Sequence, residues 1–306
     1  MNSSRVSRRE VLMGGIGVVA GLAIGGGCAS SSMCGAKKKV CHKGFKIGIC
    51  DWTMGRIAQP EALDVAKRLG ADGVQVDFGM ADDELPVLRK RSLQKKYVEL
   101  TKKHGVEIAS FGMVALGWAP YKTDPRWEQW LGEGIEVSKE MGVDIILVPF
   151  FGERDLSGDA EGRKIVARKL KVLAPKAERA GVVLGLESLM SAEQNMEIID
   201  SVGSPAAQVY YDVGNSKNKG YDIYREIRVL GKHICECHAK DYGNEMFGKG
   251  DIDFRRVREA MDEAGYRGWI VFESNKWEPD TPVSAEEELK FKKNIEYLRG
   301  IFPARV

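Results

Sequence analysis

Four side chains that can bind a metal ion or move a proton stand at the ends of four short apolar runs. They are three carboxylates and one imidazole, from Glu187, Asp212, His238 and Glu273. About 25 to 35 residues separate each from the next, which is the length of one strand followed by one helix. A mostly oxygen-rich set with one imidazole suits a divalent cation. We expect Mn²⁺, and the set leaves Mg²⁺, Co²⁺ and Zn²⁺ open.

The grouping of these side chains matters more than any one of them. A single carboxylate at a strand end is often only a helix N-cap or a loop hydrogen-bond acceptor. Four ionisable groups on four successive strands are harder to attribute to capping, because like charges brought together repel unless a cation offsets them. The sequence therefore predicts that all four residues are ligands of one metal ion.

Strand-like and helix-like segments alternate from Phe45 to the end of the chain. Amphipathic segments between the expected strands end in glycine, as helices with a glycine C-cap do. Eight such repeats predict a single-domain α/β fold, the (β/α)₈ TIM barrel, whose strand C-termini converge on one face. An open doubly wound sheet is the alternative, and it is disfavoured because no G-x-G-x-x-G follows the first strand. The expected strands are 45–51, 73–79, 106–112, 144–150, 182–188, 208–214, 233–239 and 269–274, and the glycines are Gly70, Gly105, Gly142 and Gly181.

The segment before the expected barrel reads as an export signal followed by a tether. Paired arginines in SRREVLM precede an apolar stretch, residues 14–27, that is short for a transmembrane span. The pattern resembles a twin-arginine export signal, which makes the export machinery an expected partner. We expect a signal peptide over residues 1–29, a flexible tether over 30–44 and a catalytic barrel over 45–306.

Export would place the protein in the periplasm or on a membrane through a lipid anchor at Cys28. Cys28 ends the apolar stretch, but Gly25 stands where a lipidation signal usually has leucine. Processing without a lipid, and a membrane anchor that is never cleaved, therefore stay open. Cys34 and Cys41 lie in the tether and are free to pair with each other, although nothing in the sequence requires it.

Composition and charge argue against several partners. The chain has 306 residues, a formal net charge of +2, 43% hydrophobic residues and 29% charged residues, which is ordinary for a globular protein. No basic stripe for a phosphate backbone stands out, so we expect no nucleic-acid binding. Cys235 and Cys237 alternate with His238 along one expected strand and should point away from it, as buried small hydrophobes. A homo-oligomer is left open.

The strand-end motifs resemble those of the sugar phosphate isomerase/epimerase superfamily, the xylose-isomerase-like TIM barrels of the AP endonuclease 2 type. The similarity covers nearly everything after residue 45. It implies a divalent metal held by Glu187, Asp212, His238 and Glu273, with Glu187 and Glu273 also forming the catalytic acid–base pair on opposite faces of a sugar. The matching stretches are LGLES, YYDVGN, CHAKD, GKGDIDF and GYRGWIVFES.

The resemblance implies a reaction through an enediolate of a sugar or keto-sugar. One carboxylate removes a proton next to a carbonyl, and a second returns one on the opposite face, which epimerises that carbon. Return of the proton to the neighbouring carbon would instead isomerise an aldose and a ketose. Because the N-terminal segment resembles an export signal, we expect an unphosphorylated substrate. The loop GKGDIDF is correspondingly expected to be a tight turn with a helix-capping aspartate rather than a phosphate site.

Other functions stay open on the same scaffold. A lyase or dehydratase acting on a cyclitol or a 3-keto-glycoside would use the same enediolate, and a non-catalytic periplasmic sugar-binding protein would use none. An endonuclease IV-like activity is disfavoured, because it needs a histidine-rich multi-zinc cluster. Of the four histidines here only His238 stands at a strand end.

Further strand-end residues are candidate substrate contacts. Two tryptophans offer flat faces for a sugar ring. Asn215 stands where many epimerases of this superfamily have histidine; its amide cannot act as an acid or base, so it is a hydrogen-bonding contact or a turn residue. Gln75 replaces a frequent glutamate, and Asp77 could serve as the polar group there. The full set is Trp52, Gln75, Asp77, Asn215, Lys240 and Trp277.

Overall fold

The computed structural model describes residues 44–80, 86–275 and 281–304. The expected signal peptide and tether, the lipidation candidate Cys28, the cysteines Cys34 and Cys41, and Trp277 lie outside the described residues. The expectations that concern them remain predictions.

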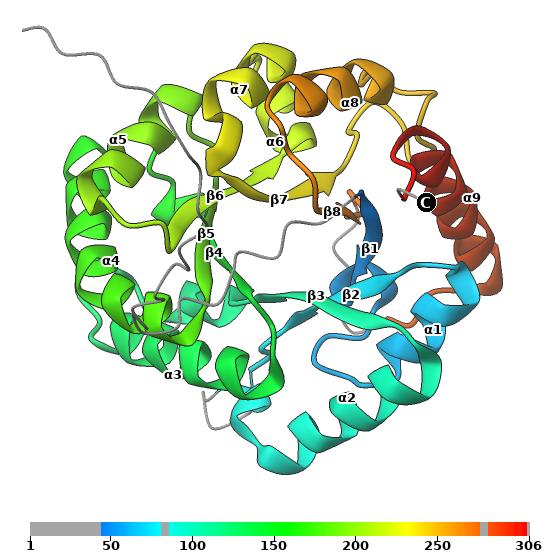
Figure 1. Cartoon of the computed structure of the whole chain (residues 1–306), viewed down its shortest axis with the longest axis horizontal. Coiled ribbons are helices and arrows are strands. Elements are labelled where there is room, and N and C mark those ends of the chain that lie inside the picture. The colour runs from blue at the N-terminus through cyan, green and yellow to red at the C-terminus, as the bar shows by residue number, and fades with distance from the viewer. Residues whose placement is uncertain (1–43, 81–85, 276–280, 305–306) are drawn as a thin grey trace, which may run out of the picture. The chain divides into compact units, whose positions relative to one another are not determined.

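Eight parallel strands close into a barrel in the order of the sequence, as predicted (Figure 1). Each strand pairs with the next, and β1 closes the ring against β8 through pairs such as Lys46 with Trp269. The strands are β1 Lys46–Cys50, β2 Gly73–Asp77, β3 Glu107–Gly112, β4 Ile145–Phe150, β5 Val183–Ser188, β6 Ala207–Asp212, β7 Ile234–Ala239 and β8 Trp269–Phe272.

Helices surround the barrel and bury one face each against it (Figure 1). The four glycines expected to cap helices all adopt the left-handed conformation, with φ of 80°, 65°, 72° and 72° for Gly70, Gly105, Gly142 and Gly181. The α-helices are α1 Ala62–Leu69, α2 Arg91–His104, α3 Arg126–Met141, α4 Ala160–Ala180, α5 Ala192–Val202, α6 Val213–Asn218, α7 Ile223–Leu230, α8 Phe254–Glu263 and α9 Ala285–Ile301.

Side chains alternate across the barrel wall, as the pleat of a strand requires. On β7, Cys237 is buried in the apolar layer that the helices cover, and Cys235 is partly buried with its thiol on the carbonyl of Val209. Glu236 and His238, with the opposite parity, are fully buried among polar groups. Cys237 is thus a buried small hydrophobe, as expected, and neither cysteine belongs to the carboxylate–histidine cluster.

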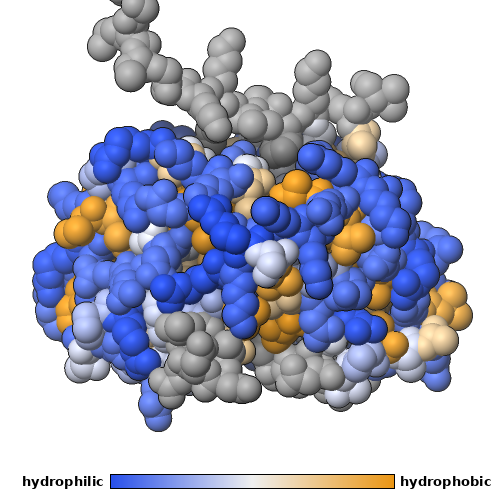
Figure 2. All heavy atoms as spheres, turned by 90° about the horizontal axis from the view of Figure 1, so that it is seen from below, coloured by the Kyte–Doolittle hydropathy of each residue, from blue (hydrophilic) through white to orange (hydrophobic). Residues whose placement is uncertain are grey.

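The described helices and one face of the surface can be compared with what a membrane span or an apolar patch requires. No helix in the described part of the chain combines the length and the apolar character needed to cross a membrane. On the face seen in Figure 2, hydrophilic side chains dominate and apolar ones are scattered in small groups. The large hydrophobic residues most exposed among those described are Trp118, Val172, Val229, Tyr242 and Leu289.

Gly73 marks a close approach inside the barrel. A methyl group at this position would lie 2.6 Å from the ring of Trp269 and 3.0 Å from the carbonyl oxygen of Glu107. We predict that Gly73→Ala lowers the free energy of unfolding by about 1–3 kcal/mol through overpacking. Urea denaturation measures this. Gly158→Ala is the control, because Gly158 is exposed and has no neighbour within 4 Å of the added carbon; equal stability of the two variants would contradict the prediction.

Candidate active site

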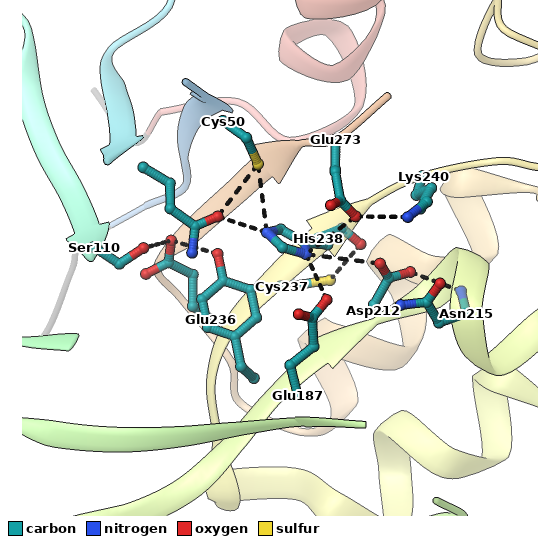
Figure 3. Close-up of polar contacts among 12 residues, drawn as sticks. Cys50, Ser110, Glu187, Asp212, Asn215, Glu236, Cys237, His238, Lys240 and Glu273 are labelled. Carbon is teal, nitrogen blue, oxygen red and sulfur yellow. Dashed lines mark hydrogen bonds and ion pairs between the residues drawn. The ribbon is translucent and has the colours of Figure 1, made fainter. Parts of the chain in front are cut away.

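The four predicted metal ligands meet at the carboxyl ends of four neighbouring strands (Figure 3). Glu187 lies near the end of β5, Asp212 ends β6, His238 lies near the end of β7, and Glu273 follows β8 directly. Each contributes one ligand atom, and these atoms all lie within 4.8 Å of one another. The parallel register therefore brings together residues that are far apart in sequence.

The three carboxylates surround a single nitrogen of His238. Nδ1 lies 2.9 Å from Oε1 of Glu187, 3.5 Å from Oε2 of Glu273 and 3.6 Å from Oδ2 of Asp212. A neutral imidazole has one N–H and cannot satisfy three carboxylates. Oδ2 of Asp212 is buried and accepts no hydrogen bond. An orphaned buried carboxylate oxygen beside two further carboxylates and an imidazole is the donor set that a divalent cation satisfies, so the cluster fits a metal.

The pKa shifts within the cluster indicate that a proton takes the place of a cation when no metal is bound. Burial, with the nearby charges of Glu273 and Asp212, raises the pKa of Glu187 to about 7 although His238 opposes the shift. Burial disfavours the ionised form of Asp212 as well, but His238 and Lys240 outweigh it and lower the pKa of that carboxyl. Burial also opposes a charged His238, yet the surrounding carboxylates raise its pKa well above the usual value. A proton is therefore the competitor of a metal ion at this point.

Lys240 and Trp52 hold Glu273 from two sides. Nζ of Lys240 donates to Oε2 at 2.8 Å, and Nε1 of Trp52 donates to Oε1 at 2.9 Å. Burial alone would discharge Lys240, but the carboxylates of Glu273 and Asp212 raise its pKa and keep it cationic. The expectation that both side chains contact substrate stays a prediction; in the structure both fix the orientation of Glu273.

Asn215 joins the cluster to its surroundings. Its backbone N–H donates to Oδ1 of Asp212 at 2.8 Å, so Asp212 caps α6 with one oxygen and leaves Oδ2 for the cluster. The side-chain oxygen of Asn215 accepts a hydrogen bond from the hydroxyl of Tyr242 at 2.9 Å. Asn215 is therefore a first-turn residue of α6 whose side chain lines the cavity, and its contact with a substrate stays a prediction.

A cavity of 270 Å³ opens above the cluster. Five sequence-predicted site residues line it, together with six further residues. The predicted residues are Trp52, Glu187, Asn215, Lys240 and Glu273, and the others are Val114, Leu147, Pro149, Phe151, Arg154 and Tyr242.

Gln75 and Asp77 do not line this cavity. Gln75 is fully buried and its Oε1 lies 2.6 Å from Nε2 of His238, beneath the cluster. The carboxylate of Asp77 accepts hydrogen bonds from the backbone of Gly79 at 2.7 Å and of Val114 at 3.0 Å. The expectation that these two residues contact substrate stays a prediction; in the structure Gln75 contacts His238, and Asp77 accepts hydrogen bonds from two loops.

Arg154 and Tyr242 are site residues that sequence reasoning missed. Arg154 lies in the 3₁₀ turn η4, Gly152–Arg154, where its Nη1 donates to the carbonyl of Gly117 at 2.5 Å. Its Nε is buried and has no hydrogen-bond partner among the described residues. The only available signal was position, because Arg154 follows the end of β4 by four residues and Tyr242 follows β7 by three.

The loop GKGDIDF behaves as a turn. The carboxylate of Asp253 accepts hydrogen bonds from the backbone of Arg255 at 2.9 Å and of Arg256 at 3.4 Å, which caps α8. Asp241 accepts a hydrogen bond from the backbone of Asp251 at 3.3 Å. The expectation of a capping aspartate is thus confirmed.

The barrel and its cluster define a class, TIM-barrel proteins with a candidate metal centre built from strand ends. Within that class the chain belongs to the family described as Xylose isomerase-like TIM barrel, which it matches over residues 63–301.

Similar proteins include several epimerases. The chain is 27% identical to L-ribulose-5-phosphate 3-epimerase UlaE of Escherichia coli K12 over 229 residues, covering 70% of this chain and 81% of the relative. The structure of D-allulose 3-epimerase from Methylomonas sp. superposes with a TM-score of 0.68 at 17% identity, covering 85% of this chain and 98% of the other. That of 3-keto-D-glucoside 4-epimerase YcjR from E. coli gives 0.65 at 18% identity, covering 84% and 99%. The two structures support the fold, and the named epimerases bear out the expectation of an isomerase or epimerase.

We predict that the affinity for Mn²⁺ rises with pH across neutrality. Glu187 has its pKa raised to about 7, so below that pH a proton on its carboxylate competes with the cation, and above it the ionised form predominates. The raised pKa of His238 acts in the same direction. Isothermal titration at about pH 6 and about pH 8 should show the Kd falling by about tenfold or more. A Kd that is constant or rises with pH would count against a metal site made of these residues.

Proposed function

We propose that this protein is a divalent-metal-dependent epimerase or isomerase of a sugar or keto-sugar. The single observation that carries the proposal is the cluster of three carboxylates around Nδ1 of His238 at the base of a cavity. The ligands are Glu187, Asp212, His238 and Glu273, and the ion we propose is Mn²⁺, with Mg²⁺, Co²⁺ and Zn²⁺ as alternatives. When bound, the cation supplies electrostatic stabilisation of the negative charge that develops on the substrate oxygens.

Glu187 and Glu273 are the proposed acid–base pair. Both line the cavity, and they come from strand positions three apart in the ring, so they approach a bound sugar from different sides. One carboxylate takes the proton from the carbon next to the carbonyl, and the other delivers a proton to the opposite face of that carbon.

Polar side chains on the cavity walls are proposed to orient the substrate. The charged Lys240, the hydroxyl of Tyr242 and the amide of Asn215 can bind hydroxyl or carbonyl oxygens. Trp52 and Phe151 offer apolar faces to a sugar ring. We propose an unphosphorylated substrate, because the N-terminal sequence resembles an export signal.

The proposed location is the periplasm, either free or tethered by a lipid on Cys28. The support is the paired arginines and the apolar residues 14–27 that follow them. The proposed partner is the export machinery that would carry the protein there. A homo-oligomer stays open.

Exchange of a substrate hydrogen with solvent tests the reaction. We predict that the Mn²⁺-loaded protein, incubated in D₂O with a panel of ketoses and 3-keto-sugars, incorporates deuterium at a carbon next to a carbonyl of at least one of them. NMR and mass spectrometry read the products. Apart from the deuterium taken up, epimerisation leaves the mass of the sugar unchanged. A lyase would instead release an unsaturated product. Binding of a sugar with no exchange anywhere in the panel would indicate a non-catalytic sugar-binding protein.

The carboxylate pair is tested by removing one acid–base group at a time. We predict that Glu187→Gln and Glu273→Gln each lower the exchange rate by about 10²–10⁴-fold, the typical contribution of a positioned acid or base. Glu99→Gln is the matched control, because Glu99 is exposed on α2. An exchange rate within about twofold of wild type for both site variants would refute the assigned roles.

Arg154 is the cavity-lining cation without a carboxylate partner among the described residues. We predict that Arg154→Met, which keeps an apolar stem but removes the charged donors, raises KM by about tenfold with a smaller change in kcat, because a charge-assisted hydrogen bond contributes about 1.5 kcal/mol or more. The control Arg168→Met removes an exposed arginine from α4. Equal KM values for wild type and Arg154→Met would place Arg154 outside substrate binding.

A further inference from the structure

The imidazole of His238 has a second polar partner, on the side away from the carboxylates. Its Nε2 lies 2.6 Å from Oε1 of Gln75, which extends from β2. Both side chains have no exposed surface, so water does not compete for this contact. Gln75 is therefore in direct contact with a proposed metal ligand without lining the substrate cavity.

A carbonyl oxygen at this position selects one tautomer of the ring. A neutral imidazole carries its hydrogen on one nitrogen and a lone pair on the other. The amide oxygen of Gln75 only accepts, so the hydrogen belongs on Nε2 and the lone pair on Nδ1. Nδ1 is the nitrogen that faces Glu187, Asp212 and Glu273. The opposite tautomer would direct an N–H at the point where a cation has to bind.

Cys50 supports this orientation of the Gln75 amide. Its thiol lies 3.3 Å from the same Oε1 and 3.5 Å from Nε2 of His238. The thiol donates a hydrogen bond to this oxygen. Among the described residues the amide nitrogen of Gln75 has no hydrogen-bond partner. The amide oxygen is the atom that contacts both the Cys50 thiol and Nε2 of His238.

Packing around His238 keeps the ring in place by other means. The ring centroids of Tyr210 and His238 lie 4.6 Å apart, and those of Trp52 and His238 lie 6.1 Å apart in a T-shaped arrangement. Removal of the Gln75 oxygen would consequently leave the ring where it is and act on the location of its proton. This separates the contribution of the hydrogen bond from that of the packing.

We propose that Gln75 is a positioning residue that holds His238 in the tautomer that binds the metal, and so sets the affinity of the site for a divalent cation. Partners of this kind, which accept the other N–H of a metal-bound histidine, commonly change metal affinity by about 10–100-fold when mutated. The inference rests on the metal site of the proposed function but not on its reaction or its substrate.

Metal affinity of three variants of the full chain tests the proposal. Gln75→Met fills a similar volume without an acceptor, and Gln75→Glu retains one. Gln208→Met is the matched control, because Gln208 is also buried and its amide bonds only the carbonyl of Pro205. By isothermal titration with Mn²⁺, we expect the Kd of Gln75→Met to rise by about 10–100-fold, while Gln75→Glu stays within about fivefold of wild type and Gln208→Met is unchanged.

A second measurement uses the wild-type protein and so does not depend on how a variant folds. In the Zn²⁺-loaded protein, which is diamagnetic, NMR of ¹⁵N-histidine should show a slowly exchanging proton on Nε2 of His238, assigned by its loss in His238→Gln. A proton on Nδ1 instead would overturn the inference.

The outcomes separate this inference from the proposed function. If wild type binds no divalent cation, both the metal site and the inference fail. If wild type binds Mn²⁺ and Gln75→Met binds it equally well, only the role of Gln75 fails. If Gln75→Glu is as weak as Gln75→Met, the hydrogen-bond acceptor is not what sets the affinity, which also overturns the inference.

Discussion

The mutual repulsion of three closely placed carboxylates is the constraint on which the rest of the site depends. Glu187, Asp212 and Glu273 face one nitrogen of His238; Glu187 and Asp212 are buried and the side chain of Glu273 is 12% exposed, so water screens their charges little. Burying ionised groups is costly unless an opposite charge compensates them. Lys240 compensates one carboxylate, and a proton or a divalent cation has to compensate the others. The raised pKa of Glu187 and the orphaned oxygen of Asp212 are two consequences of this one arrangement.

The closed barrel holds these side chains together in spite of their repulsion. Parallel pairing puts every strand end on one face, and the helices cover the outside of the wall, so the site is built on rigid elements rather than on mobile loops. Inside the wall, polar groups such as Glu236, Ser110 and Tyr210 bond one another beneath the cluster (Figure 3 labels the first two). A layer of hydrogen-bonded polar side chains therefore lies beneath the cluster, and Gln75 and Cys50 belong to this layer.

Much of the fold and of the ligand set could be predicted from the sequence, because both follow from periodicity. The helix C-caps at Gly70 and Gly142 show where each strand-plus-helix unit ends. The C-terminal ends of parallel barrel strands all lie at the same end of the barrel, so residues there are expected to lie near one another. The depth of a side chain along the barrel axis is a different matter. The pairing of β2 with β3 shifts register between Val74 and Gln75, and no local pattern announces such a shift. Gln75 was consequently expected in the cavity and lies beneath it.

Loop residues were harder still, because their position depends on contacts far away in sequence. Arg154 reaches the cavity through a hydrogen bond to Gly117, in a different loop. The most direct test of the whole account is the anomalous scattering of crystals grown with Mn²⁺. The account predicts one strong peak bound by Glu187, Asp212, His238 and Glu273. A peak elsewhere in the barrel, or no peak at these four side chains at a saturating concentration of Mn²⁺, would contradict it.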